Sequence, residues 1–252
     1  MASNGRRRCA GCLTAALFAA YVGSGHALAD AGRPKKSDII GTYAKVALAS
    51  EQGQAWSRTR RWPDAIRIAI DGDYTTEDAT KVAHTRDLIR RVIQRPMPIF
   101  FSPLSSEETA KTQVVIAFRR RAKLKRSLSL LRKSFGHGER RLELNTGSPD
   151  CMLALQPADG HDLAFAIIGV AVGISEAARA HCVSLKLTQA MGLPGVHPDA
   201  PGSVFNKTGR TKQTLLDRAL LWLHYHPEMG TGLNATQARR RTIELLNRER
   251  LK

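Results

Sequence analysis

Residues 66–96 have the sequence IRIAIDGDYTTEDATKVAHTRDLIRRVIQRP, in which the spacing of the apolar residues changes once. Isoleucine occupies every second position over 66–70, which predicts a strand with one buried face. Further on, two acids, Glu77 and Asp78, precede apolar residues at helical spacing, which continue to Pro96. A strand that is followed at once by a helix predicts a domain in which helices pack against a sheet.

The rest of the chain continues this pattern. Short β-rich runs predict further strands, and longer runs of helix-forming residues predict further helices. We therefore expect an α+β fold, with a mixed β-sheet packed by several helices in a single domain. The predicted strands cover 98–101, 113–118, 142–144, 152–155 and 163–174. The alternative for residues 163–174 is a strand that merges into a buried helix. The predicted helices cover 38–52, a basic stretch after 118, 176–191 with a stop at Gly192, 215–225 and 234–251, and residues 105–108 are predicted as a polar loop.

The first 29 residues have the features of a secretory signal peptide. Arginines at 6–8 precede an apolar run over 12–22, and 27–29 has the small-residue pattern after which signal peptidase cuts. We predict cleavage there, export by general secretion, and a mature chain of residues 30–252 that is periplasmic or secreted. The alternative is an uncleaved anchor, but the apolar run is shorter than the about 20 residues of a bilayer span. We predict no transmembrane span in the mature chain, because no second apolar run of that length follows.

The chain is strongly basic. Its formal net charge is +17, and loss of the signal peptide would remove three arginines and no acid, which leaves +14. The positive charge therefore belongs to the predicted domain, where it favours contact with anionic surfaces. Export disfavours nucleic acid as the partner, because an exported protein seldom meets it.

One predicted helix carries the densest run of positive charge. Leucines between its cations supply a possible apolar face, so the helix could contact anionic lipid or other polyanions. The alternative is an ordinary solvated helix face, and no aromatic residues interleave for stacking on bases. The candidate anion-binding residues are Arg119, Arg120, Arg121, Lys123, Lys125 and Arg126.

Two of the four cysteines, Cys9 and Cys12, lie in the predicted signal peptide. The other two, Cys151 and Cys182, would meet an oxidising compartment, which predicts a disulfide between them. The alternative is a nucleophilic thiol, which needs a base directed toward it. His181 is adjacent to Cys182 in a predicted helix, and adjacent helical residues point in different directions.

Residues 182–193, CVSLKLTQAMGL, form a motif together with two other segments. Trp62 leads into the strand at 66–73, and the helix from Leu215 leads to the sequence LHYHPEM at 223–229. These segments resemble the bacterial family known as domain of unknown function 2927, over about residues 62–246. That family in turn is similar to the zincin metalloproteases, so the resemblance implies a zincin-like single domain.

The resemblance places a degenerate metal motif on the helix at 176–191. Zincins carry His-Glu-x-x-His-x-x-Gly, in which two histidines share one helix face and the glutamate activates water. Alignment on Gly192 places Leu185 and Gln189 at the histidine positions, Lys186 at the glutamate position and Gly195 at the third-ligand position. An apolar side chain, an amide and an ammonium do not hold zinc, so we predict no metal, no cofactor and no catalytic residue there.

Two alternatives to this interpretation concern the same helix and the histidines. The helix could simply be a buried packing element that Gly192 ends. A zinc site could also be built elsewhere from His181, His197, His224 and His226, although their spacing does not match a helix-face pair with a third ligand. We expect His224 and His226 to be partly exposed near a helix end, and Met229 to belong to the core.

The leading hypothesis for function is a non-catalytic envelope protein on a zincin-like scaffold, whose groove binds a peptide or an envelope partner. The alternative is a protein that binds anionic surfaces such as lipid, lipopolysaccharide or cell-wall polymer through its positive charge. A third hypothesis is a hydrolase of non-zinc mechanism, which would depend on Cys182 or His197.

Overall fold

Six strands form one mixed sheet in the computed structural model, which describes residues 33–48, 56–135, 143–158, 160–200, 202–206 and 209–248. The order across the sheet is β2-β1-β3-β6-β5-β4, so the first strand of the chain lies inside the sheet. The strands are β1 (Ile68–Gly72), β2 (Ile99–Phe101), β3 (Val114–Arg119), β4 (Glu143–Ser148), β5 (Cys151–Pro157) and β6 (Leu163–Ala171).

The sheet has a parallel part and an antiparallel part. Strands β2, β1, β3 and β6 run parallel, and Ile70 at the centre pairs with Phe101 on one side and Ile116 on the other. Strands β5 and β4 then add as an antiparallel hairpin beside β6. The predicted mixed sheet is confirmed, and with it the α+β class.

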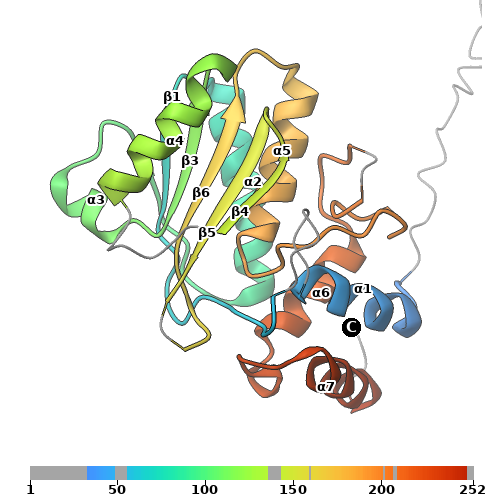
Figure 1. Ribbon diagram of the computed structural model, residues 1–252. Coiled ribbons are helices and arrows are strands. Elements are labelled where there is room, and N and C mark those ends of the chain that lie inside the picture. The colour runs from blue at the N-terminus through green and yellow to red at the C-terminus, as the bar shows by residue number, and fades with distance from the viewer. Residues whose placement is uncertain are drawn as a thin grey trace, which may run out of the picture. The chain divides into compact units, whose positions relative to one another are not determined.

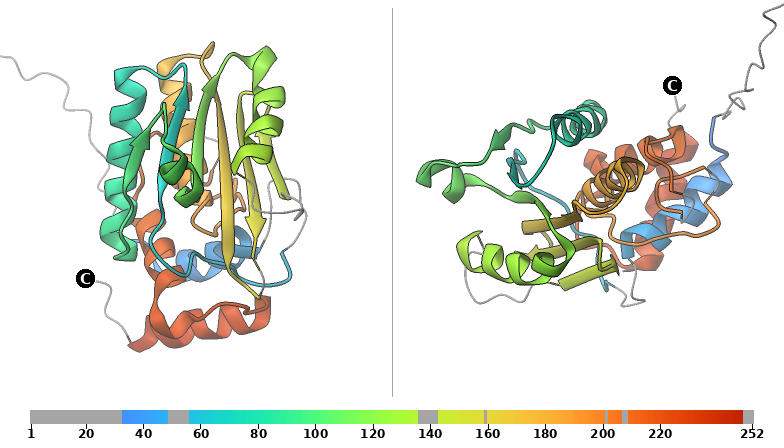
Figure 2. Two further views of the ribbon diagram at one scale, coloured as in Figure 1. Left: turned by 90° about the vertical axis from the view of Figure 1, so that its left-hand side faces the viewer. Right: turned by 90° about the horizontal axis from the view of Figure 1, so that it is seen from above.

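Helices cover both faces of this sheet. Helices α2 and α5 pack together on one face, and α4 packs against β3 and β6 on the other, as Figures 1 and 2 show. Helix α1 contacts both α6 and α7, and α6 lies beside the lower end of α2 in Figure 1. The helices are α1 (Lys36–Leu48), α2 (Thr76–Ile93), α3 (Ser106–Lys111), α4 (Arg121–Phe135), α5 (Glu176–Gln189), α6 (Leu215–Tyr225), the 3-10 turn η1 (Pro227–Met229) and α7 (Ala235–Arg248).

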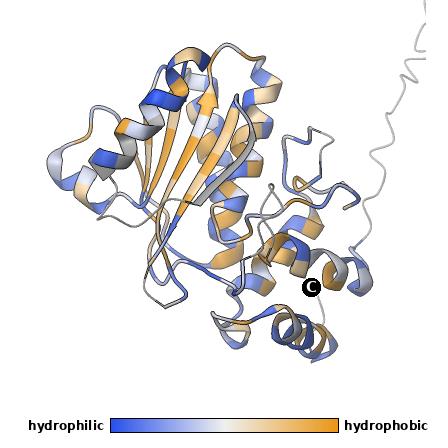
Figure 3. Ribbon diagram, in the orientation of Figure 1, coloured by the Kyte–Doolittle hydropathy of each residue, from blue (hydrophilic) through white to orange (hydrophobic). Residues whose placement is uncertain are grey.

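The prediction that the first strand has only one buried face is wrong. Ile68 and Ile70 are fully buried toward α2 and α5, but Ala69 between them is fully buried as well, in a second apolar cluster on the opposite face. Parallel strands are buried on both sides because crossover helices cover both faces. Figure 3 accordingly shows mainly hydrophobic strands between helices that carry both hydrophobic and hydrophilic residues.

The predicted polar loop at 105–108 is also wrong, because these residues begin helix α3. The Ser105 hydroxyl accepts a hydrogen bond from the Glu108 amide at 3.1 Å, and the Glu108 carboxylate accepts one from the Ser105 amide at 2.8 Å. This reciprocal capping box stabilises a helix start. The sequence does contain the signal for this helix start, since Ser105 is followed three residues later by Glu108.

The other predicted elements are found close to their expected bounds. The long apolar segment from Leu163 is a strand that ends at Ala171, and helix α5 begins separately at Glu176. Helix α6 covers the predicted residues, and the Asn234 side chain accepts from the Gln237 amide at 2.9 Å to cap α7. The predicted signal peptide, over residues 1–29, lies outside the described residues. Within the described part of the chain, each helix is too short or too polar to cross a bilayer.

Candidate functional site

Helix α5 carries the residues that the sequence singled out, and its two halves differ in burial. It follows β6 through a short turn, and the Ser175 hydroxyl caps it by accepting from the Ala178 amide at 3.2 Å. Every residue over 182–189 is buried, whereas the turn before Cys182 is partly exposed. The half that would hold a zincin motif is therefore closed within the core.

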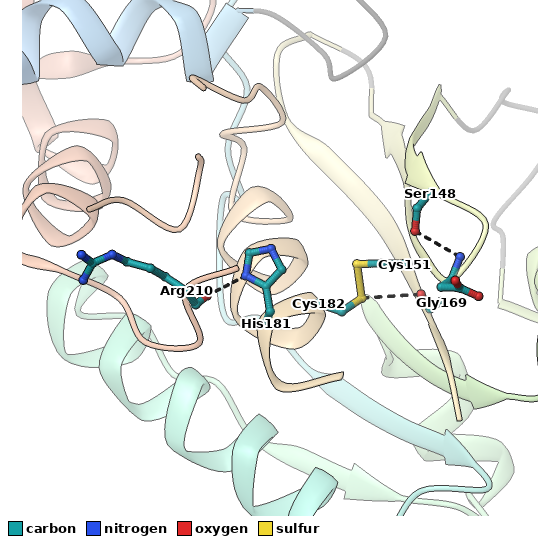
Figure 4. The surroundings of a disulfide bond; sticks show 7 residues. Ser148, Cys151, Gly169, His181, Cys182 and Arg210 are labelled. Atoms are coloured by element: carbon teal, nitrogen blue, oxygen red, sulfur yellow. Dashed lines mark hydrogen bonds between the residues drawn. A yellow bond between two sulfur atoms is a disulfide. The ribbon is translucent and has the colours of Figure 1, made fainter. Parts of the chain in front are cut away.

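The predicted disulfide between Cys151 and Cys182 is confirmed. It joins β5 to α5, with the two Cα atoms 5.6 Å apart (Figure 4). Since its sulfur is bonded, Cys182 has no thiolate to act as a nucleophile. His181 points away from the disulfide, and its Nδ1 lies 2.6 Å from the Arg210 carbonyl oxygen, as the sequence argument expected.

The degenerate motif positions have internal structural partners. Leu185, Lys186 and Gln189 are 8%, 1% and 0% exposed. The Gln189 amide nitrogen donates to the carbonyl oxygens of Pro194 and Gly195, each at 3.1 Å. Gln189 therefore fixes the turn that follows the helix.

That turn is also joined to α1 and depends on Gly192. The Gly195 amide donates to the Val46 carbonyl at 2.8 Å, so α1 lies directly against the end of the motif. Gly192 has a φ of +97°, a backbone conformation that is unfavourable for residues other than glycine. A methyl group there would lie 2.1 Å from the Arg60 carbonyl oxygen. The regular helix ends at Gln189, three residues before the predicted stop at Gly192, and Gly192 lies in the turn that follows.

Two aromatic side chains from distant segments bind the backbone carbonyls just past the end of α5. The Trp62 indole donates to the Ala190 carbonyl at 2.8 Å, and the Tyr225 hydroxyl donates to the Met191 carbonyl at 3.0 Å. Carbonyls just past a helix end have no partner within the helix, and burial would leave them unsatisfied. These roles of Trp62 and Tyr225 leave no signal in the sequence, because a helix-terminal carbonyl imposes no pattern on the residues that bind it.

His224 is buried at 1% exposure, so the expectation that it is partly exposed is wrong. Its Nε2 lies 2.9 Å from the Arg60 carbonyl, which can only accept, and therefore Nε2 carries the proton. Nδ1 then accepts from the Tyr43 hydroxyl at 3.0 Å. Both ring nitrogens are occupied by protein groups. His226, in contrast, is partly exposed as expected, and Met229 is buried in the core.

Burial lowers the pKa of His224 to about 4, and the nearby positive charge of Arg61 adds to this effect, while the hydrogen bond to Arg60 opposes it. As the pH falls below 6.5, His224 of the unfolded chain binds a proton, whereas His224 of the folded chain stays neutral until about pH 4. We therefore expect the contribution of His224 to the free energy of unfolding to be complete above pH 6.5 and to decrease by about 3 kcal/mol at pH 4.

Urea denaturation between pH 4 and pH 8 measures this dependence. A His224→Gln variant serves as the control, because it removes the titrating group and leaves every other one in place. The difference in free energy of unfolding between the natural chain and the variant should shrink as the pH falls below 6.5. A difference that stays constant down to pH 4 contradicts the assignment.

The remaining histidines are spread over the structure. His197 Nε2 lies 3.2 Å from the Lys45 ammonium on α1, and burial together with that charge lowers the pKa of His197. Among the described residues, no three of the histidine, cysteine, aspartate and glutamate side chains gather closely enough to hold a metal ion. The four histidines of the alternative zinc site are thus not brought together.

The candidate anion-binding residues lie at the end of β3 and on α4. Leu124 is fully buried against the sheet, whereas Leu130 on the same helix is 54% exposed. Arg119 pairs with Asp71, and Arg121 pairs with Asp150. The other four, which are Arg120, Lys123, Lys125 and Arg126, are exposed and form no ion pair with another described residue.

Residues 36–243 match the family described as protein of unknown function DUF2927. The chain belongs to this family. The predicted resemblance is confirmed, but its start at about residue 62 was placed too late, because the DUF2927 match includes α1. Comparison with curated proteins and with solved structures found no significant match.

Residues in the described part of the DUF2927 domain line two surface pockets that the sequence did not predict. One, of about 390 Å³, lies between the ends of α2 and α6 and is lined in part by Arg95, Trp222 and Tyr225. The other, of about 450 Å³, lies between the beginnings of α2 and α5 and is lined mainly by charged and hydroxyl side chains. Neither pocket includes the degenerate motif positions of α5.

Proposed function

We propose that this DUF2927 protein is an exported, non-catalytic protein on a zincin-like scaffold, which binds a peptide or another envelope partner. The observation that carries the proposal is the closed half of α5. Lys186 and Gln189 stand where a zincin has its glutamate and second histidine, and both side chains are buried.

The chemistry of these positions supports binding without hydrolysis. An ammonium repels a divalent cation and cannot accept a proton from water, and a leucine offers no lone pair. The Gln189 nitrogen is bound to two carbonyls of the turn at Pro194 and Gly195, and α1 covers that turn. A metal ion at this helix would therefore need both new ligands and a rearranged core.

Metal analysis and a hydrolysis assay of the purified protein test the proposal. After incubation with zinc and desalting, we expect far less than one metal ion per chain, and no turnover on a mixed panel of peptides and esters. A known zinc protease that is treated in the same way is the positive control. Stoichiometric zinc that survives desalting, or turnover that a chelator abolishes, would overturn the proposal.

A second candidate function is binding to anionic surfaces, and the outward face of α4 favours it. That helix contains no acidic residue, and its exposed cations lie opposite the face that packs on the sheet. Exposed Lys and Arg side chains are attracted to anionic headgroups, each contributing about 1 kcal/mol near the surface.

Neutralising three of these cations tests the second candidate. We expect Lys123→Gln, Lys125→Gln and Arg126→Gln together to weaken binding to phosphatidylglycerol vesicles by about tenfold or more. Added salt should likewise weaken the binding of the natural chain to these vesicles. The matched control changes Arg239, Arg240 and Arg241 on α7 to glutamine, since two of them pair with Glu244. Equal losses from the two triple variants would contradict a specific role of α4.

A further inference from the structure

The pocket between the beginnings of α2 and α5 combines charges of both signs. Glu77, Lys81 and His84 reach it from α2, and Glu176 reaches it from α5. Lys212 reaches it from the segment that precedes α6. The volume of about 450 Å³ is in the range of small-ligand sites.

The segment that carries Lys212 is held firmly against both helices. The Ser184 hydroxyl of α5 donates to the Thr211 carbonyl at 2.6 Å, and the Lys81 ammonium of α2 donates to the same carbonyl. The neighbouring Arg210 carbonyl lies 2.6 Å from Nδ1 of His181 (Figure 4). These contacts fix Lys212 beside Lys81.

The charges are separated along the helix axes. Glu77 and Glu176 lie in the first turns of α2 and α5. Lys81 and His84 lie four and seven residues after Glu77, which at 1.5 Å per residue places them about 6 and 10 Å further along α2. One end of the pocket is therefore acidic and the other end is basic.

These charges have no ion-pair partners among the residues that the structure describes. The adjacent carboxylate of Asp78 does have one, because it pairs with Arg179 at 2.8 Å. Burial lowers the pKa of Lys81, and the positive charge of Lys212 lowers it further. An anion placed between the two lysines would relieve this repulsion.

We propose that this pocket binds a dipeptide or tripeptide with free termini, with its ammonium at Glu77 and Glu176 and its carboxylate at Lys81 and Lys212. Extended peptides of two and three residues span about 7 and 10 Å, close to the rises of about 6 and 10 Å from Glu77 to Lys81 and to His84. The proposal rests on the proposed function as a protein that binds peptides without cleaving them, and it names the site and the ligand class.

Calorimetric titration of the purified protein with trialanine tests this inference. We expect N-acetylation or C-amidation of the tripeptide to weaken binding about tenfold each, because each removes one charge-assisted contact. Lys212→Gln should weaken binding of trialanine but not of its amide. Glu77→Gln should weaken binding of trialanine but not of its acetylated form. Both residues are exposed, so these variants should unfold at the same temperature as the natural chain.

Lys35→Gln, just before α1, is the matched control, since it removes an exposed cation outside the pocket and should leave the affinity unchanged. No heat with trialanine at about 10 mM, or equal affinity for the free and capped peptides, overturns the inference. Neither result touches the proposed function, which fails instead if the trialanine is cleaved during the titration or if stoichiometric zinc is found.

Discussion

Replacement of Gly192 by alanine is expected to lower the free energy of unfolding by about 4 kcal/mol or more, a large part of the stability of a domain of this size. The φ of +97° alone disfavours any side chain by about 1 to 2 kcal/mol. The new methyl group would also lie 2.1 Å from the Arg60 carbonyl oxygen and 2.6 Å from Nε2 of His224.

The contact with Arg60 makes the substitution severe. A clash with the end of a flexible side chain can be relieved by rotation, but a carbonyl oxygen moves only with its backbone. The same carbonyl accepts the hydrogen bond from His224, so a shift of this backbone would also leave a buried ring nitrogen unsatisfied. Chemical denaturation of the purified variant measures the loss.

Gly230→Ala is the matched control. Gly230 also has a positive φ, of +68°, but a methyl group there would meet no atom within 4 Å. We expect this control to lose about 2 kcal/mol through backbone strain alone, because its φ of +68° and ψ of 179° are strained for any residue other than glycine. Adding His224→Ala to Gly192→Ala should not restore stability, because the clash with the Arg60 carbonyl remains. If the Gly192 and Gly230 variants lose similar amounts, the close approach at Gly192 is not present in solution.

Removal of the disulfide is expected to lower the free energy of unfolding by about 4 kcal/mol. The bond closes a loop between residues 31 apart in the sequence, and the loop-closure entropy for that length corresponds to about 3.7 kcal/mol. The measurement is urea denaturation of a Cys151→Ala, Cys182→Ala double variant beside the natural chain.

A reducing agent provides the control for this second prediction. Reduction should destabilise the natural chain by a similar amount and leave the double variant unchanged, because the variant has no bond to break. Each single variant should behave like the double variant. A natural chain that is equally stable with and without reductant would show that the bond between β5 and α5 does not form in solution.

Some of the features of helix α5 were predictable from the sequence. Residue chemistry alone shows that Leu185, Lys186 and Gln189 offer no ligand set for zinc. Only the structure adds that Gln189 fixes the turn at Pro194 and Gly195, since an amide can bond to many carbonyls within reach. The burial of His224 was missed for a related reason, because its partners Tyr43 and Arg60 lie far from it in the sequence.

Local spacing of residues determined the helices, the strands and the α+β class, since these depend on residues close in sequence. The disulfide pair follows from the two cysteines that lie outside the predicted signal peptide. The tertiary structure alone decided which helix faces are covered. Burial is a property of every segment that packs against a residue, and α1, Trp62 and Tyr225 close one half of α5 from distant parts of the chain. The same dependence places Lys212 beside Lys81, because hydrogen bonds between segments over a hundred residues apart hold them together.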